Sequence, residues 1–538
     1  MSSEARRFDA IVIGSGIGGL TAALTVARRE RSVLVLEAGK QFGGYTNPFK
    51  RRAYSFDPGL HYIGECGPGG HFSRLIERLG LDDLRFRELS PDGFDRLVFP
   101  GYEVRMPKGA ERYHERLARD FPHEKQGLER FFKILRDFKG AIASLDKIRG
   151  AASALKAAPH LPFLVKYFRA TYKDLLDPII KDPLLKAVLG AQGGDYGLPP
   201  GKASAMIGLG LIDHYLGGAY FPIGGSRAVR DAFVKGIEAH GGVMKRNHAV
   251  ERIHVENGKV TGVRCANGEE FFAETVISNA DAGVTYREMI GADHLSSSMK
   301  KKTEKTQLSL ASVCLFIGLE GDVAKDGMTD ANIWHYPSID LERAYAPLAR
   351  GEMPPEDFFF LSSPSLKDPD SPDKAPPGHS TLELVTLVPY APFTRWAGTK
   401  TMKRGDGYAA MKEQLADRYL RCVERYVPGV RARIKVLEVA TPLTNVSFAA
   451  APAGNIYGPD YTPDQMGPWR YAAKGEVGGL YLCGSSTLGA GIVPAALSGA
   501  TAGKMAAKGA PARAVSAPVP ARVRAAKSDD AIAVPPAE

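Results

Sequence analysis

The sequence predicts an α/β fold, because an apolar run near its N-terminus leads into a glycine-rich turn, a helix and a second apolar run. Residues 8–13 (FDAIVI) and 32–38 (SVLVLEA) show no alternation, as expected for strands buried on both faces. The chain has 538 residues, 44% hydrophobic and 24% charged, which is ordinary globular composition for about two to four structural units. Disordered, collagen-like and disulfide-rich classes are excluded for most of the chain.

The turn GSGIGG at residues 14–19 has the pattern of a dinucleotide-binding loop. Gly14 permits the tight turn, Gly16 lets the backbone approach a pyrophosphate, and Gly19 lets the following helix pack close to the strand. The helix N-terminus supplies amides for the phosphates, and Glu37 at the end of the second strand can bind the ribose hydroxyls. We therefore predict a dinucleotide site, in preference to a purely structural turn. Its residues are Gly14, Gly16, Gly18, Gly19 and Glu37.

A second glycine pair, in the run AGKQFGGYTNPF after the second strand, favours FAD over NAD. This arrangement resembles the FAD-binding extension of the flavin amine-oxidase and phytoene-desaturase superfamily, where the glycine turn lies along the cofactor. The resemblance implies cofactor contacts from Ala38, Gly43, Gly44 and Tyr45. Relatives often have Arg directly after the glycine pair, so the chain departs from the family pattern at Tyr45.

Residues 56–64 (FDPGLHYIG) make the resemblance more specific. They are similar to the FDxGxHYIG segment of the retinol saturase and carotenoid isomerase branch of the phytoene desaturase family. Residues 107–109 (PKG), 121–122 (FP) and 220–226 (YFPIGGS) match further family segments in the same order. The resemblance covers about residues 8–507, and its motifs are specific for the family but not for a substrate.

Two later segments resemble the parts of the family that complete the FAD site. Residues 248–281 read as a three-stranded meander, a further strand and Asn279, with turn signals at 256–258 and 266–268. In relatives, the residue matching Val250 contacts the adenine end of FAD through its backbone. Residues 479–507 read as a buried strand, a glycine-rich loop and a helix whose N-terminus faces the pyrophosphate and flavin in relatives. The implied FAD residues of this segment are Gly484, Ser485, Gly491, Ile492 and Val493. Ser485 stands where relatives commonly have Asp.

The separation of these segments predicts a discontinuous, Rossmann-like FAD-binding domain over residues 1–106, 222–305 and 436–509. The insertions, residues 107–221 and 306–435, are expected to form a mixed helical and sheet (α+β) substrate domain that faces a membrane. An apolar stripe predicts a core-packed helix, with Leu128, Phe131, Phe132, Leu135 and Phe138 on one face. We expect residues 362–380, rich in Pro, Ser and Asp, to form a surface loop, and residues 510–538 a flexible tail.

His61 is the sharpest candidate for a catalytic residue, since bound flavin needs only groups that position substrate or move a proton. The matching family segment runs toward the flavin-facing cavity, and an imidazole with a usual pKa of about 6.5 can donate a proton to an allylic carbon. The alternative is a buried histidine whose nitrogens bond backbone groups. Tyr62 and Tyr220 either line the substrate path or serve in packing.

Together these features predict an FAD-dependent oxidoreductase that acts on C=C bonds of a long apolar polyene, such as a carotenoid- or retinoid-like isoprenoid. Saturation, desaturation and isomerisation share hydride exchange at the flavin and movement of one proton, and the motifs favour reduction or isomerisation. The alternative enzymes are an unsaturated fatty acid double-bond isomerase and a flavin amine oxidase. A flavin-binding scaffold without activity is the non-enzymatic alternative, which the departures at Tyr45 and Ser485 keep open.

The formal charge of +10 raises the question of an anionic partner. We expect no nucleic-acid binding, because no nucleic-acid module is visible, and solvated surface charge explains much of the excess. Residues 148–173 mix Leu, Phe and Tyr with Arg and Lys and contain no acidic residue, which is typical of a segment that contacts an anionic membrane. The alternative is a packed helical pair with a basic solvent face. Pro159 and Pro162 predict two short helices there.

The remaining composition bears on metals and location. Five separated cysteines without a CxxC pair predict no metal site and fit a reducing compartment. The N-terminus leads directly into the first strand, leaving no room for a signal peptide, and no apolar run is long enough to span a bilayer. We expect a cytoplasmic protein, either free or peripheral on the membrane face.

Overall fold

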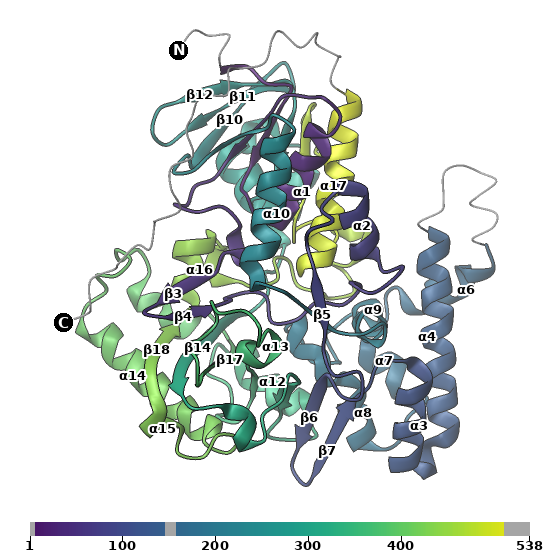
Figure 1. Cartoon of the computed structure of the whole chain (residues 1–538). Helices are drawn as coiled ribbons and strands as arrows, with labels where there is room; N and C mark the ends of the chain where they lie inside the picture. Colours follow the sequence, from purple (N-terminus) through teal and green to yellow (C-terminus); the bar gives the residue numbers. More distant parts are fainter. Residues whose placement is uncertain (1–5, 146–157, 510–538) are drawn as a thin grey trace.

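The computed structural model describes residues 6–145 and 158–509, so the predicted tail at 510–538 lies outside the described residues. Two sheets organise the chain. Figure 1 shows α1, α10 and α17 close together in the upper half of the molecule, where the five-stranded sheet lies, and β14, β17 and β18 of the seven-stranded sheet in the lower half.

The smaller sheet is parallel, in the order β19-β13-β1-β2-β9. Its strands are β1 (Ala10–Ile13), β2 (Val33–Leu36), β9 (Val243–Lys245), β13 (Val276–Ser278) and β19 (Leu480–Leu482). The sequences AIVI and VLVL of β1 and β2 are fully buried, as a parallel sheet covered on both faces requires. The strand, glycine turn, helix and strand predicted at the N-terminus are therefore confirmed.

Helices α1 (Ile17–Ala27) and α17 (Ile492–Gly509) pack against each other with almost no side chain between them. A Cβ on Gly499 would lie 2.1 Å from the carbonyl oxygen of Gly18, and a Cβ on Gly503 would lie 2.7 Å from that of Ala22. Because these contacts ascend along both helices together, the helices run parallel. Their N-termini consequently lie at the same end of the sheet.

The predicted meander is confirmed as an antiparallel sheet in the order β10-β11-β12. Its strands are β10 (Val250–Glu256), β11 (Lys259–Cys265) and β12 (Glu270–Phe272). Its core side chains pack with one face of the parallel sheet, including Ile11 and Leu34, while α10 (Gly225–Ala239) packs against α1. The first sheet is thereby covered, and only its edges and ends are open to a ligand.

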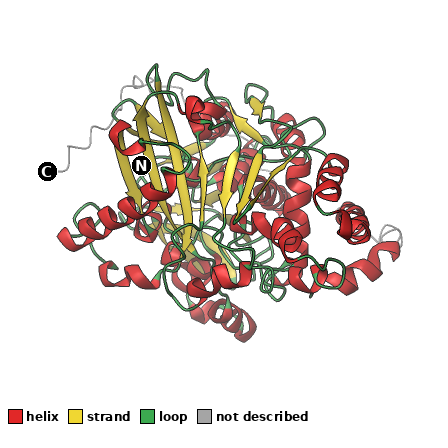
Figure 2. Ribbon diagram, turned by 90° about the horizontal axis from the view of Figure 1, so that it is seen from below, coloured by secondary structure: helices red, strands yellow, loops and turns green. Residues whose placement is uncertain are grey.

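The larger sheet has seven strands in the order β18-β14-β17-β16-β15-β6-β7, and only the β15–β6 pair is parallel. The strands are β6 (Asp95–Phe99), β7 (Tyr102–Met106), β14 (Ala311–Glu320), β15 (Asn332–His335), β16 (Phe359–Ser362), β17 (His379–Val388) and β18 (Ile434–Ala440). Figure 2 shows strands side by side in the middle of the molecule with helices around them.

The strands of this sheet do not respect two of the predicted domain boundaries. Strands β6 and β7 fall within the segment 1–106 expected in the cofactor domain, yet they belong to the larger sheet, where β6 pairs with β15 and β7 pairs with β6. Strand β18 runs across the boundary at 435/436 and pairs with β14. Strand patterning shows that a segment is half-buried but not which sheet it joins, so the sequence could not place these strands.

Helices fill the remaining volume. They are α2 (His71–Leu79), α3 (Ala110–Asp120), α4 (Lys125–Leu145), α6 (Leu161–Tyr167), α7 (Tyr172–Leu176), α8 (Pro183–Gly190), α9 (Ala205–Leu216), α11 (Ser297–Lys305), α12 (Leu341–Ala349), α13 (Pro364–Lys367), α14 (Asp406–Val423), α15 (Val430–Arg433) and α16 (Pro442–Ala449). Two small antiparallel pairs, β3 (Phe49–Arg51) with β4 (Tyr54–Phe56) and β5 (Phe86–Glu88) with β8 (Tyr220–Pro222), connect the two halves. The predicted apolar stripe of α4 is confirmed, since all five of its side chains are buried.

The expectation of a surface loop at 362–380 is wrong in its main part. The segment includes α13, and the side chains of Lys367 and Lys374 are buried in the interior. Asp370 is exposed, so only part of the segment is a surface turn. The prediction rested on the content of Pro, Ser and Asp, which is typical of surface turns. It missed the two lysines, whose buried partners lie far away in sequence.

Candidate cofactor and active site

Four of the predicted cofactor segments meet at one edge of the parallel sheet. Gly14 follows β1, Glu37 follows β2, Asn279 follows β13, and Gly484 comes shortly after β19. Since all these strands are parallel, their carboxyl ends lie together. Ligands of open α/β sheets bind at this edge.

The side chain of Asn279 lies at the centre of this meeting point. A Cβ on Gly16 would lie 2.8 Å from its Nδ2 atom, and a Cβ on Gly18 would lie 2.4 Å from its Oδ1 atom. Gly484, with a φ of 83°, would bring a Cβ to 2.6 Å from the same Oδ1 atom. These glycines thus let the first loop and the segment at Gly484 pack closely around the Asn279 amide. The sequence did not reveal this role of Asn279.

The other two glycines of the first loop have the expected geometry. Gly14 has a φ of 85°, which favours glycine, and a Cβ on Gly19 would lie only 2.0 Å from the carbonyl oxygen of Gly14. Helix α1 then starts after Gly16 without a side-chain cap. Its first-turn amides are therefore available to an anion such as a pyrophosphate.

The Glu37 carboxylate is held in place by three hydrogen bonds from Ser15 and Gly39. Its Oε2 atom accepts from the backbone nitrogen of Ser15 at 2.9 Å and from the Ser15 hydroxyl at 2.5 Å, and its Oε1 atom accepts from the Gly39 nitrogen at 2.7 Å. A carboxylate has about four acceptor sites, so capacity remains for a ribose hydroxyl. Ala38, the next residue along the chain, is exposed beside it.

Ser15 was not among the predicted residues, although it joins the two glycine segments. Its Oγ atom accepts from the backbone nitrogen of Gly43 at 3.0 Å while donating to Glu37. Gly43 and Gly44 have φ values of 119° and 55°, and a Cβ on Gly44 would lie 3.2 Å from the Cα atom of Gly16. The second glycine turn therefore lies directly on the first loop.

Tyr45 occupies the sequence position where relatives often have Arg, and Arg230 is the cation that lies nearby in space. The Tyr45 hydroxyl donates to the carbonyl of Asn455 at 3.4 Å, and burial raises its pKa, so it is neutral. The nearby cation comes from α10 instead: a Cβ on Gly43 would lie 2.9 Å from the Cδ atom of Arg230. Arg230 donates to the Asn47 side chain at 2.9 Å, which fixes it beside the glycine pair.

The remaining predicted FAD residues lie at the two ends of this site. Val250 begins β10, two residues after His248, whose backbone nitrogen donates to the carbonyl of Glu37 at 2.8 Å. Gly491, Ile492 and Val493 form the start of α17. Gly499 of α17 lies beside Gly18, near the start of α1. At a rise of about 1.5 Å per residue, the first turn of α17 therefore extends about 9 Å past the first turn of α1 along the helix axis. The uncapped first turn of α1, the free acceptor of Glu37 and the converging glycine turns together fit FAD.

His61 lies near the glycine turn, and a buried carboxylate holds it. The Nδ1 atom of His61 is 2.9 Å from the Oε2 atom of Glu383, whose side chain is fully buried on β17. The Nε2 atom has no hydrogen-bond partner among the described residues, and the side chain is 19% exposed. The segment reaches the cofactor turn because a Cβ on Gly59 would lie 2.6 Å from the Tyr45 side chain.

His61 contacts a group of charged side chains in the protein interior. We call this group the buried ionic cluster; its members are Asp57, Asp95, Asp195, Lys367, Lys374 and Glu383. At one end, Lys374 pairs with Asp57, and both side chains are almost fully buried. Asp57 also accepts from the backbone nitrogen of Ser226 at 2.9 Å, and its own nitrogen donates to Glu383 at 2.8 Å. The carboxylate that holds His61 is itself held in place.

Lys367 connects His61 to the other end of the cluster. Its Nζ atom donates to the carbonyl of His61 at 2.7 Å and to the Asn332 side chain at 2.5 Å. Asn332 in turn donates to Asp95 at 2.8 Å. Burial lowers the pKa of Lys367 to about 8, and the negative charges of Glu383 and Asp95 oppose that shift.

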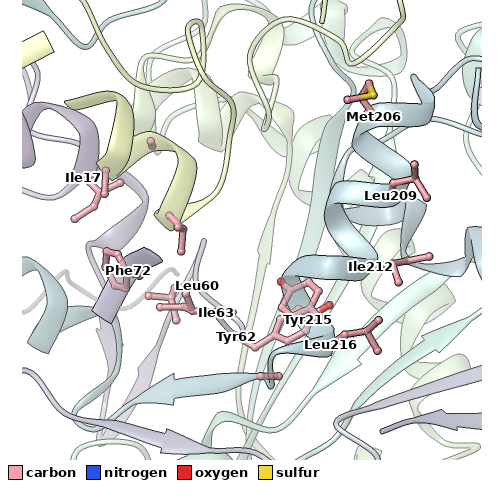
Figure 3. Packing of buried hydrophobic residues seen from close by; sticks show 14 of the residues in the cluster. Ile17, Leu60, Tyr62, Ile63, Phe72, Met206, Leu209, Ile212, Tyr215 and Leu216 are labelled. Atoms are coloured by element: carbon pink, nitrogen blue, oxygen red, sulfur yellow. The ribbon is translucent and has the colours of Figure 1, made fainter. Parts of the chain in front are cut away.

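Tyr62 lies between two acidic side chains. Its hydroxyl is 3.0 Å from Asp195 and 3.3 Å from Asp95, and its ring stacks on Tyr215 with centroids 4.3 Å apart (Figure 3). A phenol has one proton, so Tyr62 cannot donate fully to both carboxylates. Burial raises the pKa of Asp195 to about 7 and that of Asp95 to about 6, which agrees with a shared proton.

Of these residues, the sequence identified only His61 and Tyr62. Asp57 follows β4, Asp95 lies on β6, Glu383 on β17 and Lys367 on α13. Asp195 and Lys374 lie in the segments that follow α8 and α13, and no local pattern connects these six residues. The one available signal was the unusual pair of lysines in a segment that otherwise resembled a loop. Tyr220, also singled out, is buried in β8 near Glu88, with 3.3 Å between its hydroxyl and that carboxylate.

Comparison with known proteins identifies the family. The family model described as "Flavin containing amine oxidoreductase" matches residues 17–504, so the chain belongs to that family. Zebrafish (Danio rerio) all-trans-retinol 13,14-reductase is 28% identical over 520 residues, which are 92% of this chain and 85% of the relative. Chloroplastic prolycopene isomerase 1 of an Oncidium hybrid cultivar is 28% identical over 523 residues, covering 92% of this chain and 83% of the relative.

Among solved structures, an oxidoreductase from Methanosarcina mazei has a TM-score of 0.60 at 16% identity, covering 91% of this chain and 99% of the other. This likeness shows the fold. Together the findings confirm the predicted superfamily, the α/β fold, FAD as the cofactor and the classification as an FAD-dependent oxidoreductase. The names of the two curated relatives agree with the resemblance to the retinol saturase and carotenoid isomerase branch.

Proposed function

We propose that the enzyme reduces or isomerises C=C bonds of a long apolar polyene, with His61 as the group that moves the proton. The observation that carries the proposal is the geometry of His61: the buried Glu383 fixes one ring nitrogen, and the other has no hydrogen-bond partner among the described residues. Gly59, two residues before His61, contacts Tyr45 of the cofactor turn. A histidine held in this way can give and take a proton repeatedly without turning. The similarity to a retinol reductase and a prolycopene isomerase supports a polyene as the substrate class.

Bound FAD supplies the hydride exchange at its flavin, and the protein must provide the rest. In a reduction, His61 would protonate one carbon of the double bond from Nε2, and the other carbon would receive the hydride that bound FAD supplies. Glu383 stabilises the protonated imidazole and keeps Nδ1 turned away from the substrate. Lys367 fixes the backbone carbonyl of His61, so the ring stays in position while its charge changes.

The direct test is anaerobic incubation of photoreduced enzyme with separate retinoids, carotenoids and unsaturated fatty acids, and of oxidised enzyme with amines, followed by product analysis. Saturated or isomerised polyene products, with flavin reoxidation in the saturating case, would support the proposal. Conversion of fatty acids or of amines alone, the latter with oxidised enzyme, would replace it with one of the alternative activities. No conversion by enzyme that holds a full complement of FAD would leave a scaffold role.

We also propose that α6 contacts an anionic membrane from which an apolar substrate is taken. Among the described residues, no helix is long and apolar enough to span a bilayer. Two apolar side chains of α6 nonetheless point outward, with Leu161 57% and Val165 74% exposed, and Lys166 and Arg169 lie beside them. Cations beside exposed apolar groups suit a membrane interface. The predicted segment 148–173 is only partly described, since residues 146–157 lie outside the described ranges.

The structure changes which residues test this contact. Phe163 and Phe168 pack inward, against Phe138 of α4 and against Trp469, with ring centroids 6.4 and 5.5 Å apart. Substituting them would disturb packing, so the informative variant is Leu161→Ser with Val165→Ser. Co-sedimentation with vesicles that contain anionic lipid should fall about fivefold or more, because two apolar side chains that would enter the lipid are lost. High salt should weaken it further. Unchanged sedimentation of this double variant would exclude α6 as the contact.

A further inference from the structure

Arg470 is a buried cation next to the flavin-side cofactor loop. It follows the turn Gly467–Trp469, and only 4% of the residue is exposed. Its Nη2 atom donates to the carbonyl of Ser485 at 2.6 Å and to the carbonyl of Pro459 at 3.2 Å. Ser485 is one of the residues expected to contact FAD, so Arg470 is bonded directly to the cofactor loop.

The same side chain also reaches the far end of this loop through Tyr461. The guanidinium carbon lies 4.5 Å from the centroid of the Tyr461 ring, and the Tyr461 hydroxyl accepts from the backbone nitrogen of Ala490 at 2.5 Å. Ala490 precedes Gly491 and the start of α17. Arg470 is therefore linked to both ends of the loop 484–491, one directly and one through a single ring.

Two of the three guanidinium nitrogens have no acceptor. The Nε and Nη1 atoms of Arg470 are buried without a hydrogen-bond partner among the described residues. The Oδ1 atom of Asp460 is also buried without a partner, so this neighbouring acid does not satisfy them. Buried donors of a charged group are costly unless an acceptor is supplied, and burial lowers the pKa of Arg470 for that reason.

We propose that Arg470 is a cofactor-contacting residue whose Nε and Nη1 atoms donate to an acceptor oxygen of FAD, while Nη2 holds the loop at Ser485. FAD offers phosphate oxygens and flavin carbonyl oxygens, and a planar guanidinium fork binds such acceptors well. The inference rests on the family's flavin and not on the proposed polyene substrate. Its test uses FAD binding, so it stands or fails separately from the substrate assignment.

The experiment compares Arg470→Met and Arg470→Lys with the wild-type full chain. We expect the Kd for FAD to rise at least tenfold in Arg470→Met and less in Arg470→Lys, which keeps the charge but not the fork. Thermal unfolding without added FAD measures separately what Arg470 contributes to the protein alone, because loss of its bonds to Ser485 and Pro459 and removal of an incompletely paired buried charge act in opposite directions. The stabilisation that added FAD gives should shrink, since it depends on the Kd.

Two control variants separate this role from simple bracing of the loop. Arg169→Met removes an exposed cation that lies 4.5 Å from the Trp469 ring but does not bond the loop, and its FAD Kd should stay within about twofold of wild type. Asp460→Asn should also leave the Kd unchanged. An unchanged Kd in Arg470→Met would overturn the proposal. An equal loss in Asp460→Asn would also overturn it, because Arg470 would then act through an ion pair with Asp460.

Discussion

The cofactor edge of the parallel sheet and the buried ionic cluster meet near Gly59, and they differ in the kind of contact that holds each together. At the cofactor edge of the parallel sheet the contacts are mostly with backbone: Gly16, Gly18 and Gly484 approach one amide side chain, and a single carboxylate closes the loop. In the buried ionic cluster the contacts are between long charged side chains, such as Lys374 with Asp57. The first region depends on the absence of side chains, the second on their exact pairing.

This difference predicts how each region fails. A backbone site is damaged by any added side chain, because close approach leaves no room. A cluster of paired charges is damaged by any removed one, because the partner is left buried and uncompensated. The same substitution made outside each region should then have little effect, and this contrast can be measured.

The largest expected effect is the loss of FAD in Gly16→Val. Its Cβ would lie 2.8 Å from the Asn279 side chain, and the added methyl groups would extend toward the place of the pyrophosphate. We expect purified variant without stoichiometric flavin absorbance, with its circular dichroism retained. Gly407→Val is the matched control, because no atom lies within 4 Å of a Cβ there. Full flavin occupancy in Gly16→Val would show that the first loop does not hold the pyrophosphate.

The two regions also differ in how far the sequence predicts them. The glycine turns, Glu37 and the strands around them form local patterns of a few residues each, and the carboxyl ends of parallel strands must meet, so most of the cofactor edge was predictable. Asn279 was expected at the site, but its central packing was not. The ionic cluster joins Asp57 to Lys374 and His61 to Glu383 across more than 300 residues. No spacing rule connects such positions, so only the fold brings them together.

The second effect concerns His61. If it moves the proton, His61→Ala should keep FAD bound while turnover falls by roughly 10²–10⁴-fold, as for removal of a general acid. The measurement is the rate of polyene conversion, together with flavin content. His240→Ala serves as the control, since that imidazole is exposed and bonds only the carbonyl of Gly236. A rate within about threefold of wild type would assign His61 a structural role.

The third effect tests the cluster by stability. Lys374→Met leaves the Asp57 carboxylate buried without its cation, and we expect about 3–5 kcal/mol of destabilisation in urea unfolding at saturating FAD. Lys50→Met removes an ion pair with Asp373 in which both side chains are about half exposed, and it should cost less than about 1 kcal/mol. If the two substitutions lowered the free energy of unfolding equally, burial of the Lys374–Asp57 pair would not matter for stability. That result would contradict the view that the ionic cluster depends on its pairing.

The smallest effect is expected at Glu37, where the cofactor edge depends on a side chain. Glu37→Gln keeps the shape but only one oxygen, so the amide of Ser15 or that of Gly39 loses its acceptor, and the negative charge toward the ribose is also lost. A hydrogen bond to a charged group contributes about 1.5–3 kcal/mol, so the Kd for FAD should rise about 10- to 150-fold. Equilibrium titration of the flavin measures this directly. Asp9→Asn is a suitable control, because Asp9 bonds Ser32 at the opposite end of β1 and β2 and should leave the Kd unchanged. If Glu37→Gln binds FAD as tightly as wild type, the carboxylate supports only the protein loop. The cofactor edge would then bind FAD without a contribution from the Glu37 charge.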